Sequence, residues 1–283
     1  MNQQAAEASG GPSRADPIDV ATSPLRLRGY RRELEARLYT PGLTRDEGMV
    51  VYLHEGGFTG GDLDSAHAAA ATAAATLRRR VLTIAYSLAP AEPFPAAVED
   101  TLCALAWCSR HSARVSVAGV EAGGNLAAAA ALASRDRRAP ALCAQLLITP
   151  MLDPTLSSVS MRGTPLADRR GARCCFACYR SYLPSVGDRM HPYAAPATAT
   201  RLARLAPALI VTAEDDPLRG EAEQYAIRLE QAGVRTRLLR AASLAQLADP
   251  ADPAWLWREF DAFVDVPVGT ASCDRTDPAA PRT

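Results

Sequence analysis

The chain has 283 residues, and 48% of them are hydrophobic, which is enough for one large core. Its 31 basic and 31 acidic residues balance to a formal net charge of zero, so the sequence shows no basic footprint for nucleic acid and no polybasic membrane patch. No apolar stretch reaches the length of a membrane span, and the first residues lack the basic start and apolar stretch of a secretory signal. Every residue of the Lys+Arg class is arginine, which excludes lysine Schiff-base chemistry.

Short apolar runs alternate with helical patterns along the chain. Two apolar segments near the start, 25–27 and 34–39, predict antiparallel edge strands. The apolar runs that follow predict strands at 49–54, 81–86, 114–119, 143–149, 207–212 and 235–239. The intervening patterns predict helices near 65–79, 96–108, 124–134, 221–232 and 254–264. This order predicts an α/β fold in which a mostly parallel central sheet carries helices on both faces.

Two polar tails and one insertion lie outside this alternation. Residues 1–22 and 268–283 are rich in Ala, Asp, Pro and Thr, and we expect both to be disordered. The domain between them, 23–267, contains an irregular stretch at about 152–205. An insertion near the carboxyl ends of parallel strands is expected to form a lid or cap over a substrate pocket.

The seven cysteines are an odd number and accompany no recognisable signal, so we expect reduced thiols and a cytoplasmic protein. Their only local cluster is Cys174, Cys175 and Cys178. No second cysteine pair and no nearby histidine supports a metal site there, and we interpret the cluster as small residues on a helix of the lid. The sequence also lacks phosphate-loop and dinucleotide fingerprints, so we expect no metal, nucleotide or flavin cofactor.

Four motifs follow one another in the order expected for one known family. They are HEGGF at 54–58, YSLAPAEPFPAAVED at 86–100, VAGVEAGGNL at 117–126 and TAEDDPLR at 212–219. Together they resemble the hormone-sensitive-lipase and acetyl-esterase family over about residues 36–266. The resemblance implies the α/β-hydrolase fold. The segment before the first motif is shorter than is usual in the family, so we expect a reduced cap, a wider pocket mouth, or a cap completed by a neighbouring subunit. The resemblance also implies a homodimer, because members of the family often dimerise.

The same resemblance implies an oxyanion hole and a triad acid. The donors of the oxyanion hole would be the backbone N–H groups of Gly56, Gly57 and Ala122, and the triad acid would be Asp216. Backbone donors do not depend on the side chains around them, so we expect the hole to be retained.

Two positions depart from the family's Ser–His–acid triad. The turn that carries the nucleophilic serine has Glu121 instead, and the histidine position aligns with Gln246. All four histidines of the chain precede Asp216, so none can occupy the third triad position. Loss of a triad member normally costs several orders of magnitude in rate, which argues against ordinary serine-esterase chemistry.

Glu121 and Glu55 are the candidate acid–base groups. A carboxylate beside an apolar pocket is partly desolvated, so its pKa rises and it suits proton transfer near neutral pH. Glu55 replaces the first glycine of the oxyanion loop, and two carboxyls facing one pocket disfavour each other's ionisation. The alternative is that both side chains point to solvent or pair with arginines.

Three functions remain open on the sequence. The leading hypothesis is a non-hydrolytic enzyme in which Glu121 and the oxyanion hole cyclise, dehydrate or isomerise a small apolar carbonyl compound, in natural-product biosynthesis. The alternative is an inactive esterase homologue that binds a small ligand or a protein. The third is a hydrolase in which Glu121 activates water.

Overall fold

The computed structural model describes residues 19–45, 48–138, 140–158, 170–247, 252 and 254–265, without the side chains of 170–173. Its strands are β1 (Val20–Arg28), β2 (Glu33–Pro41), β3 (Met49–Leu53), β4 (Arg80–Ile84), β5 (Val115–Val120), β6 (Gln145–Ile148), β7 (Ala208–Ala213) and β8 (Thr236–Ala241). Its helices are α1 (His67–Leu77), α2 (Ala96–His111), α3 (Ala122–Arg137), α5 (Arg170–Tyr182), α6 (Arg219–Gln231), α7 (Leu244–Leu247) and α8 (Trp255–Asp265). Two 3₁₀ turns, η1 (Asp188–Met190) and η2 (Pro196–Thr198), lie between α5 and β7.

The eight strands form one sheet in the order β1-β2-β4-β3-β5-β6-β7-β8. The strands from β4 to β8 pair in parallel, whereas β1 pairs antiparallel with β2 and β2 pairs antiparallel with β4. The sequence prediction of a mostly parallel sheet with an antiparallel edge pair is confirmed. Strands β3, β6 and β7 are buried along their whole length, as their unbroken apolar sequences require in a sheet covered on both faces.

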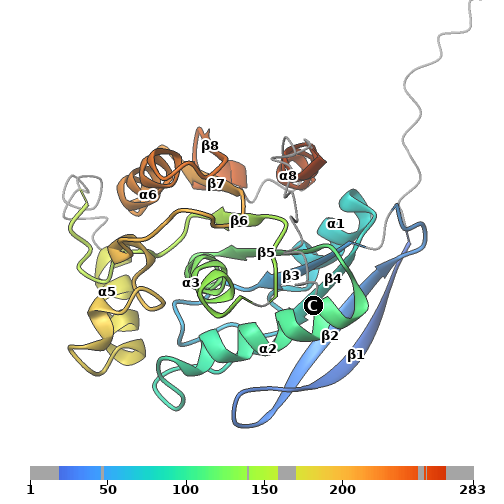
Figure 1. Ribbon diagram of the computed structural model, residues 1–283, viewed down its shortest axis with the longest axis horizontal. Helices are drawn as coiled ribbons and strands as arrows, with labels where there is room; N and C mark the ends of the chain where they lie inside the picture. The colour runs from blue at the N-terminus through green and yellow to red at the C-terminus, as the bar shows by residue number, and fades with distance from the viewer. Residues whose placement is uncertain are drawn as a thin grey trace, which may run out of the picture.

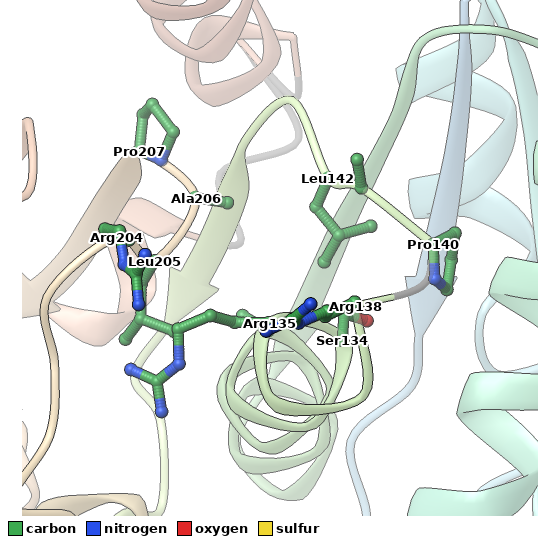
Figure 2. Close-up of a pocket in the computed structure, with 11 residues that line it drawn as sticks. Ser134, Arg135, Arg138, Pro140, Leu142, Arg204, Leu205, Ala206 and Pro207 are labelled. Carbon is green, nitrogen blue, oxygen red and sulfur yellow. The ribbon is translucent and has the colours of Figure 1, made fainter. Parts of the chain in front are cut away.

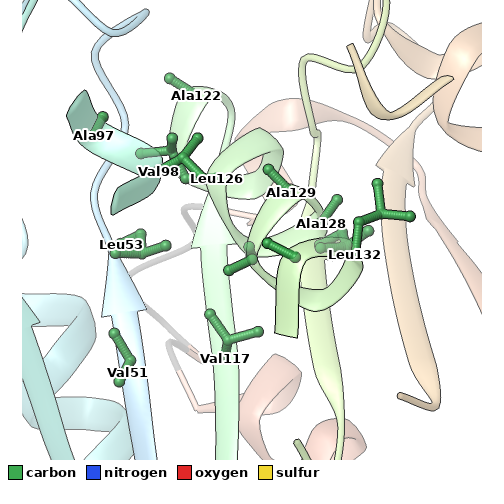
Figure 3. Packing of buried hydrophobic residues seen from close by; sticks show 14 of the residues in the cluster. Val51, Leu53, Ala97, Val98, Val117, Ala122, Leu126, Ala128, Ala129 and Leu132 are labelled. Carbon is green, nitrogen blue, oxygen red and sulfur yellow. The ribbon is translucent and has the colours of Figure 1, made fainter. Parts of the chain in front are cut away.

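Helices cover both faces of the sheet and form two separate cores. Residues of α2, α3, α5 and α6 pack in one core, and residues of α1 and α8 pack in the other. Figure 1 shows α2 and α3 side by side on one side of β5, with α1 and α8 on the other. The alanine-rich helix α3 lies close against the sheet and shares one core with Leu53 of β3 and Val117 of β5 (Figure 3).

The structure differs from the sequence prediction at the first strand. Val20–Thr22 were placed in the N-terminal tail, yet they begin β1 and pair with Tyr39–Pro41 of β2. Residues 1–18 of the expected N-terminal tail and the whole expected C-terminal tail, 268–283, lie outside the described residues. Within the expected lid, 152–205, the helix that carries the cysteine cluster is present as α5, and 159–169 lie outside the described residues. No helix in the described ranges combines the length and apolar character needed to cross a bilayer.

Candidate active site

The turn from β5 into α3 holds Glu121 in an uncommon backbone conformation. Its φ of +50° and ψ of −111° lie outside the regions that side-chain-bearing residues prefer, at a cost of about 1–3 kcal/mol. A Cβ added to Gly119 would lie 2.1 Å from the Gly123 carbonyl oxygen, and one on Gly123 would lie 2.2 Å from that of Leu53. Strand, turn and helix therefore approach too closely for any side chain at these two glycines, and the tight turn fixes where Glu121 stands.

The loop after β3 brings backbone donors to this turn. Gly56 and Gly57 have φ of +120° and +60°, which a glycine adopts without strain. Thr59 and Gly60 both donate their N–H groups to the Gly56 carbonyl and close the loop. The Gly56 N–H donates to Glu121 Oε2 over 3.4 Å, so a predicted oxyanion donor and the glutamate of the turn meet at one site.

The first turn of α3 supplies the third predicted donor. Ala122 is the first residue of the helix and is buried. N–H groups of a first helical turn have no partner within the helix, and the positive end of the helix dipole attracts negative charge. The backbone around Glu121 thus favours an anion, although the roles of Gly57 and Ala122 as donors remain predictions.

Glu55 shares this site with Glu121. Its side chain is exposed, yet partial desolvation and then the negative charge of Glu121 raise its pKa. Neither carboxylate forms an ion pair with an arginine in the described part of the chain. Glu121 is therefore close enough to Glu55 for its charge to raise the Glu55 pKa, while a shared acid–base role for the two carboxyls stays a prediction.

Asp216 lies in the loop between β7 and α6, and its carboxyl is buried. Oδ1 accepts a hydrogen bond from Leu218 N over 2.8 Å, whereas Oδ2 has no partner among the described residues. Burial raises the pKa of Asp216 to about 6, helped by the negative charges of Asp215 and Glu121. Asp216 and Glu121 are therefore close enough to interact electrostatically, and the role of Asp216 as the triad acid stays a prediction.

Gln246 does not join this group through a hydrogen bond to Asp216. It lies on the short helix α7 with an exposed side chain, and its Oε1 accepts from Ala242 N over 2.7 Å. Its own N–H donates to the Ser243 carbonyl over 3.1 Å. The side chain closes its local turn, which is a structural role.

His54 supports the loop from beneath. Its Nδ1 lies 2.6 Å from the Glu55 carbonyl oxygen, and its ring stacks on Tyr86 with centroids 4.1 Å apart. The Tyr86 hydroxyl donates to the His54 carbonyl over 2.9 Å. Burial lowers the pKa of His54, which favours a neutral ring that braces the loop.

Sequence reasoning missed Glu221, a second buried carboxyl next to the site. Its Oε1 accepts from Leu152 N over 2.7 Å, and its Oε2 has no partner in the described residues. Burial raises its pKa to about 8, and the negative charges of Asp153 and Asp216 add to the effect. One signal was present: Glu221 precedes Tyr225 and Leu229 by four and eight positions, which places it on the apolar face of α6.

Sequence reasoning also missed the position of α5 over the oxyanion loop. The ring of Tyr182 stacks on Phe58, with centroids 3.9 Å apart. This packing brings Cys178 so close to Gly57 that a Cβ added to Gly57 would lie 2.4 Å from the Cys178 sulfur.

The cysteines of α5 stay as thiols beside the site. Burial and then the charge of Glu121 raise the pKa of Cys175 to about 12, so this thiol stays protonated at neutral pH. The cysteines form an apolar wall, and no group of three His, Cys, Asp or Glu in the described ranges could hold a metal ion.

A family model described as the alpha/beta hydrolase fold matches residues 50–245, which include Glu55, Glu121 and Asp216 and end one residue before Gln246. The chain belongs to the alpha/beta hydrolase fold family. It is 36% identical to the carboxylic ester hydrolase LipN of Mycobacterium tuberculosis over 84% of this chain. The match covers 66% of LipN, slightly less than two thirds of its length.

Further relatives and solved structures carry similar names. The chain is 36% identical to the carboxylesterase NlhH of M. tuberculosis, over 73% of this chain and 68% of that protein. Among solved structures, an arylesterase superposes with a TM-score of 0.79 at 28% identity, covering 89% of this chain and 85% of its own. A bacterial heroin esterase superposes with a TM-score of 0.77 at 32% identity, covering 88% and 84%.

These relatives overturn the leading hypothesis from the sequence. A non-hydrolytic cyclase, dehydratase or isomerase is wrong, because relatives at 31–36% identity over most of this chain are named as ester hydrolases. The hypothesis gave two side chains, Glu121 and Gln246, more weight than the long match around them. The comparisons point to hydrolysis, which was the third alternative.

Proposed function

We propose that the chain hydrolyses carboxylic esters, with Glu121 as the general base that activates a water molecule. The contact between Glu121 Oε2 and the Gly56 N–H, at 3.4 Å, carries this proposal. It puts a proton acceptor within reach of an atom bound at the oxyanion donors. A bond of this length is weak, so an ester carbonyl oxygen can take its place on the Gly56 N–H.

The reaction balances without a covalent enzyme intermediate. The water oxygen bonds to the ester carbonyl carbon while Glu121 takes one water proton, and the carbonyl oxygen becomes an oxyanion. Gly56, Gly57 and Ala122 are the proposed backbone donors to that oxyanion. The intermediate then collapses, the bond to the alcohol oxygen breaks, and Glu121 returns the proton to the leaving alkoxide.

Two sequence features support this route over an acyl-enzyme route. Residue 121 is a glutamate, and the chain has no histidine after His191, so no histidine follows Asp216 to activate a serine. The environment of the site is largely apolar, with Phe58, Cys175 and Tyr179 packed in the same core. Small apolar esters are therefore the proposed substrates.

Hydrolysis of p-nitrophenyl acetate and butyrate tests the proposal. We expect Glu121→Gln to lower kcat/KM by about 10²–10⁴-fold, the range that a general base contributes. The matched control is Glu230→Gln on α6, an exposed glutamate far along the helix from the site, which should retain wild-type activity. Wild-type hydrolysis at the background rate, or an unchanged rate in Glu121→Gln, would overturn the proposal.

A single turnover in ¹⁸O-labelled water separates general-base catalysis from attack by the Glu121 carboxylate itself. Direct attack would form an anhydride, and its hydrolysis at the Glu121 carbonyl would leave label in the peptide that contains Glu121 and none in the acid product. We expect label in the acid product and none in that peptide, as measured by mass spectrometry.

The proposal also includes a cellular location and an oligomeric state. The six described cysteines are free thiols, which supports a reducing, cytoplasmic location. A homodimer follows from the family resemblance alone, and light scattering on the purified protein measures it directly.

A further inference from the structure

A double cavity lies at the far end of α3 from the proposed active site. The helix runs for 16 residues from the turn at Glu121, which corresponds to about 24 Å. One cavity, of about 320 Å³, lies between the end of α3, the segment at 140–142 and the segment at 204–207 that leads into β7 (Figure 2). A neighbouring cavity of about 530 Å³ shares Arg135, Arg138 and Arg204 with it.

Arg135 is a fixed part of this wall. Its Nη1 donates to the Arg201 carbonyl over 2.6 Å and to the Ala203 carbonyl over 3.2 Å. Its Nε and Nη2 donate to Asp136 Oδ1 over 3.0 and 2.8 Å. Arg135 therefore holds the segment around Arg201 against α3, and its own charge is neutralised.

Three further arginines lie around the cavities, and of these Arg201 interacts electrostatically with Asp136 without forming an ion pair. The side chains of Arg138, Arg201 and Arg204 have neither a hydrogen bond nor an ion pair with any described residue. Asp136 is the one carboxylate among the described lining residues, and it is already engaged, since its second oxygen accepts from the Tyr193 hydroxyl over 2.9 Å. The larger cavity thus presents three positive charges to whatever enters it.

The end of α3 offers a simpler explanation for only some of these residues. Basic side chains near a helix C-terminus compensate the negative end of the helix dipole, and Arg135 and Arg138 are placed to do so. Arg201 and Arg204 come from a different segment, about 60 residues later in the chain, and like charges brought together repel unless an anion joins them.

We propose that this double cavity binds a phosphorylated small molecule. Its phosphate groups lie among Arg138, Arg201 and Arg204, because guanidinium groups bind phosphate oxygens in pairs. Its apolar part lies in the smaller cavity, where Leu142, Leu205 and Pro207 form the wall. Both volumes fall in the range of small-molecule sites, and three cations favour a diphosphate over a single carboxylate.

Calorimetric titration of the purified protein with inorganic pyrophosphate and with adenosine diphosphate tests the proposal. We expect both to bind, the nucleotide more tightly because it also fills the apolar cavity, and both to weaken with added NaCl. In the double variant Arg201→Gln/Arg204→Gln, we expect the Kd of each to rise by about tenfold or more. The matched control, Arg110→Gln/Arg189→Gln, removes two exposed arginines outside both cavities and should change Kd less than about twofold.

Three outcomes would contradict the proposal. The first is that neither probe binds to the wild type at low salt. The second is an equal loss of affinity in the control variant, which would mean attraction to the overall charge of the protein. The third is that pyrophosphate binds as tightly as the nucleotide, which would exclude the apolar part of the site. Circular dichroism of both double variants shows whether the fold is intact.

Discussion

Replacement of Glu221 by Gln should make the protein more stable at neutral and alkaline pH. In the folded chain burial raises the pKa of Glu221 from 4.5 to about 8. Between these values the unfolded chain has lost the proton while the folded chain keeps it. The free energy of unfolding therefore falls as pH rises, by up to about 1.4 kcal/mol per pH unit. The stabilisation from the protonated carboxyl is complete below 4.5 and is lost as pH rises through about 8.

Glutamine keeps the neutral shape of the protonated acid and cannot ionise. Its side-chain oxygen can still accept the hydrogen bond from Leu152 N, so the local packing is retained. We expect wild type and Glu221→Gln to be similar near pH 4.5, and the variant to be more stable by roughly 3–5 kcal/mol at pH 8. Asp216, whose pKa is also raised, is present in both proteins, but its charge helps raise the Glu221 pKa, so this interaction is part of the measured difference.

Urea unfolding curves at several pH values between 5 and 8.5 measure this difference. The control is Glu230→Gln, which changes an exposed glutamate on the same helix and should differ from wild type by a small amount that does not vary with pH. A difference between wild type and Glu221→Gln that stays constant across this range would refute the reasoning. It would mean that Glu221 ionises at its ordinary pKa despite its burial.

Three further substitutions test the architecture around the site. Gly57→Ala should strongly reduce ester hydrolysis, because the φ of residue 57 is +60° and the added methyl group would meet the Cys178 sulfur at 2.4 Å. Near-ultraviolet circular dichroism should show that the aromatic side chains of α5 are displaced. Asn125→Ala should cost about 2–3 kcal/mol in urea unfolding, because the buried Asn125 amide donates to the Met151 and Ala194 carbonyls. Arg79→Gln should cost about 3–5 kcal/mol by the same measurement, because the buried guanidinium pairs with Asp261 and Asp265 and ties α8 to the sheet. A loss below about 1 kcal/mol in either stability variant would contradict its assigned role.

Local spacing made the turn at Glu121 predictable from the sequence. Glycines at 119, 123 and 124 after an apolar run indicated a strand and helix in close contact, and the contacts at Gly119 and Gly123 confirm this. The beginning of β1 was not predictable in the same way. Its residues are mostly exposed, so no alternating apolar pattern marks them, and pairing with β2 alone makes them a strand.

Tertiary packing determined the features that the sequence did not reveal. The thiol of Cys178 meets Gly57 because Tyr182 stacks on Phe58, and these segments are more than a hundred positions apart. Glutamate is a residue type that usually faces solvent, whereas Glu221 lies on the buried face of α6. At Glu221 a charged residue type occupies a buried position, and such conflicts are expected near functional sites.

At the turn around residue 121 the backbone resembles that of ester hydrolases, whereas the side chain is a glutamate. The backbone at residue 121 adopts φ of +50°, and the close contacts at Gly119 and Gly123 impose that turn whatever side chain it carries. The long match to ester hydrolases includes this turn and the loop at Gly56. It therefore supports ester hydrolysis and the backbone oxyanion donors that we propose. The side chain of Glu121 bears on how the attacking water is activated. A carboxylate can take a proton from water, whereas an acyl-enzyme would need a histidine to activate the water that hydrolyses it. The proposed hydrolysis through activated water is consistent with both observations, since it keeps the reaction of the relatives and uses the carboxylate at position 121.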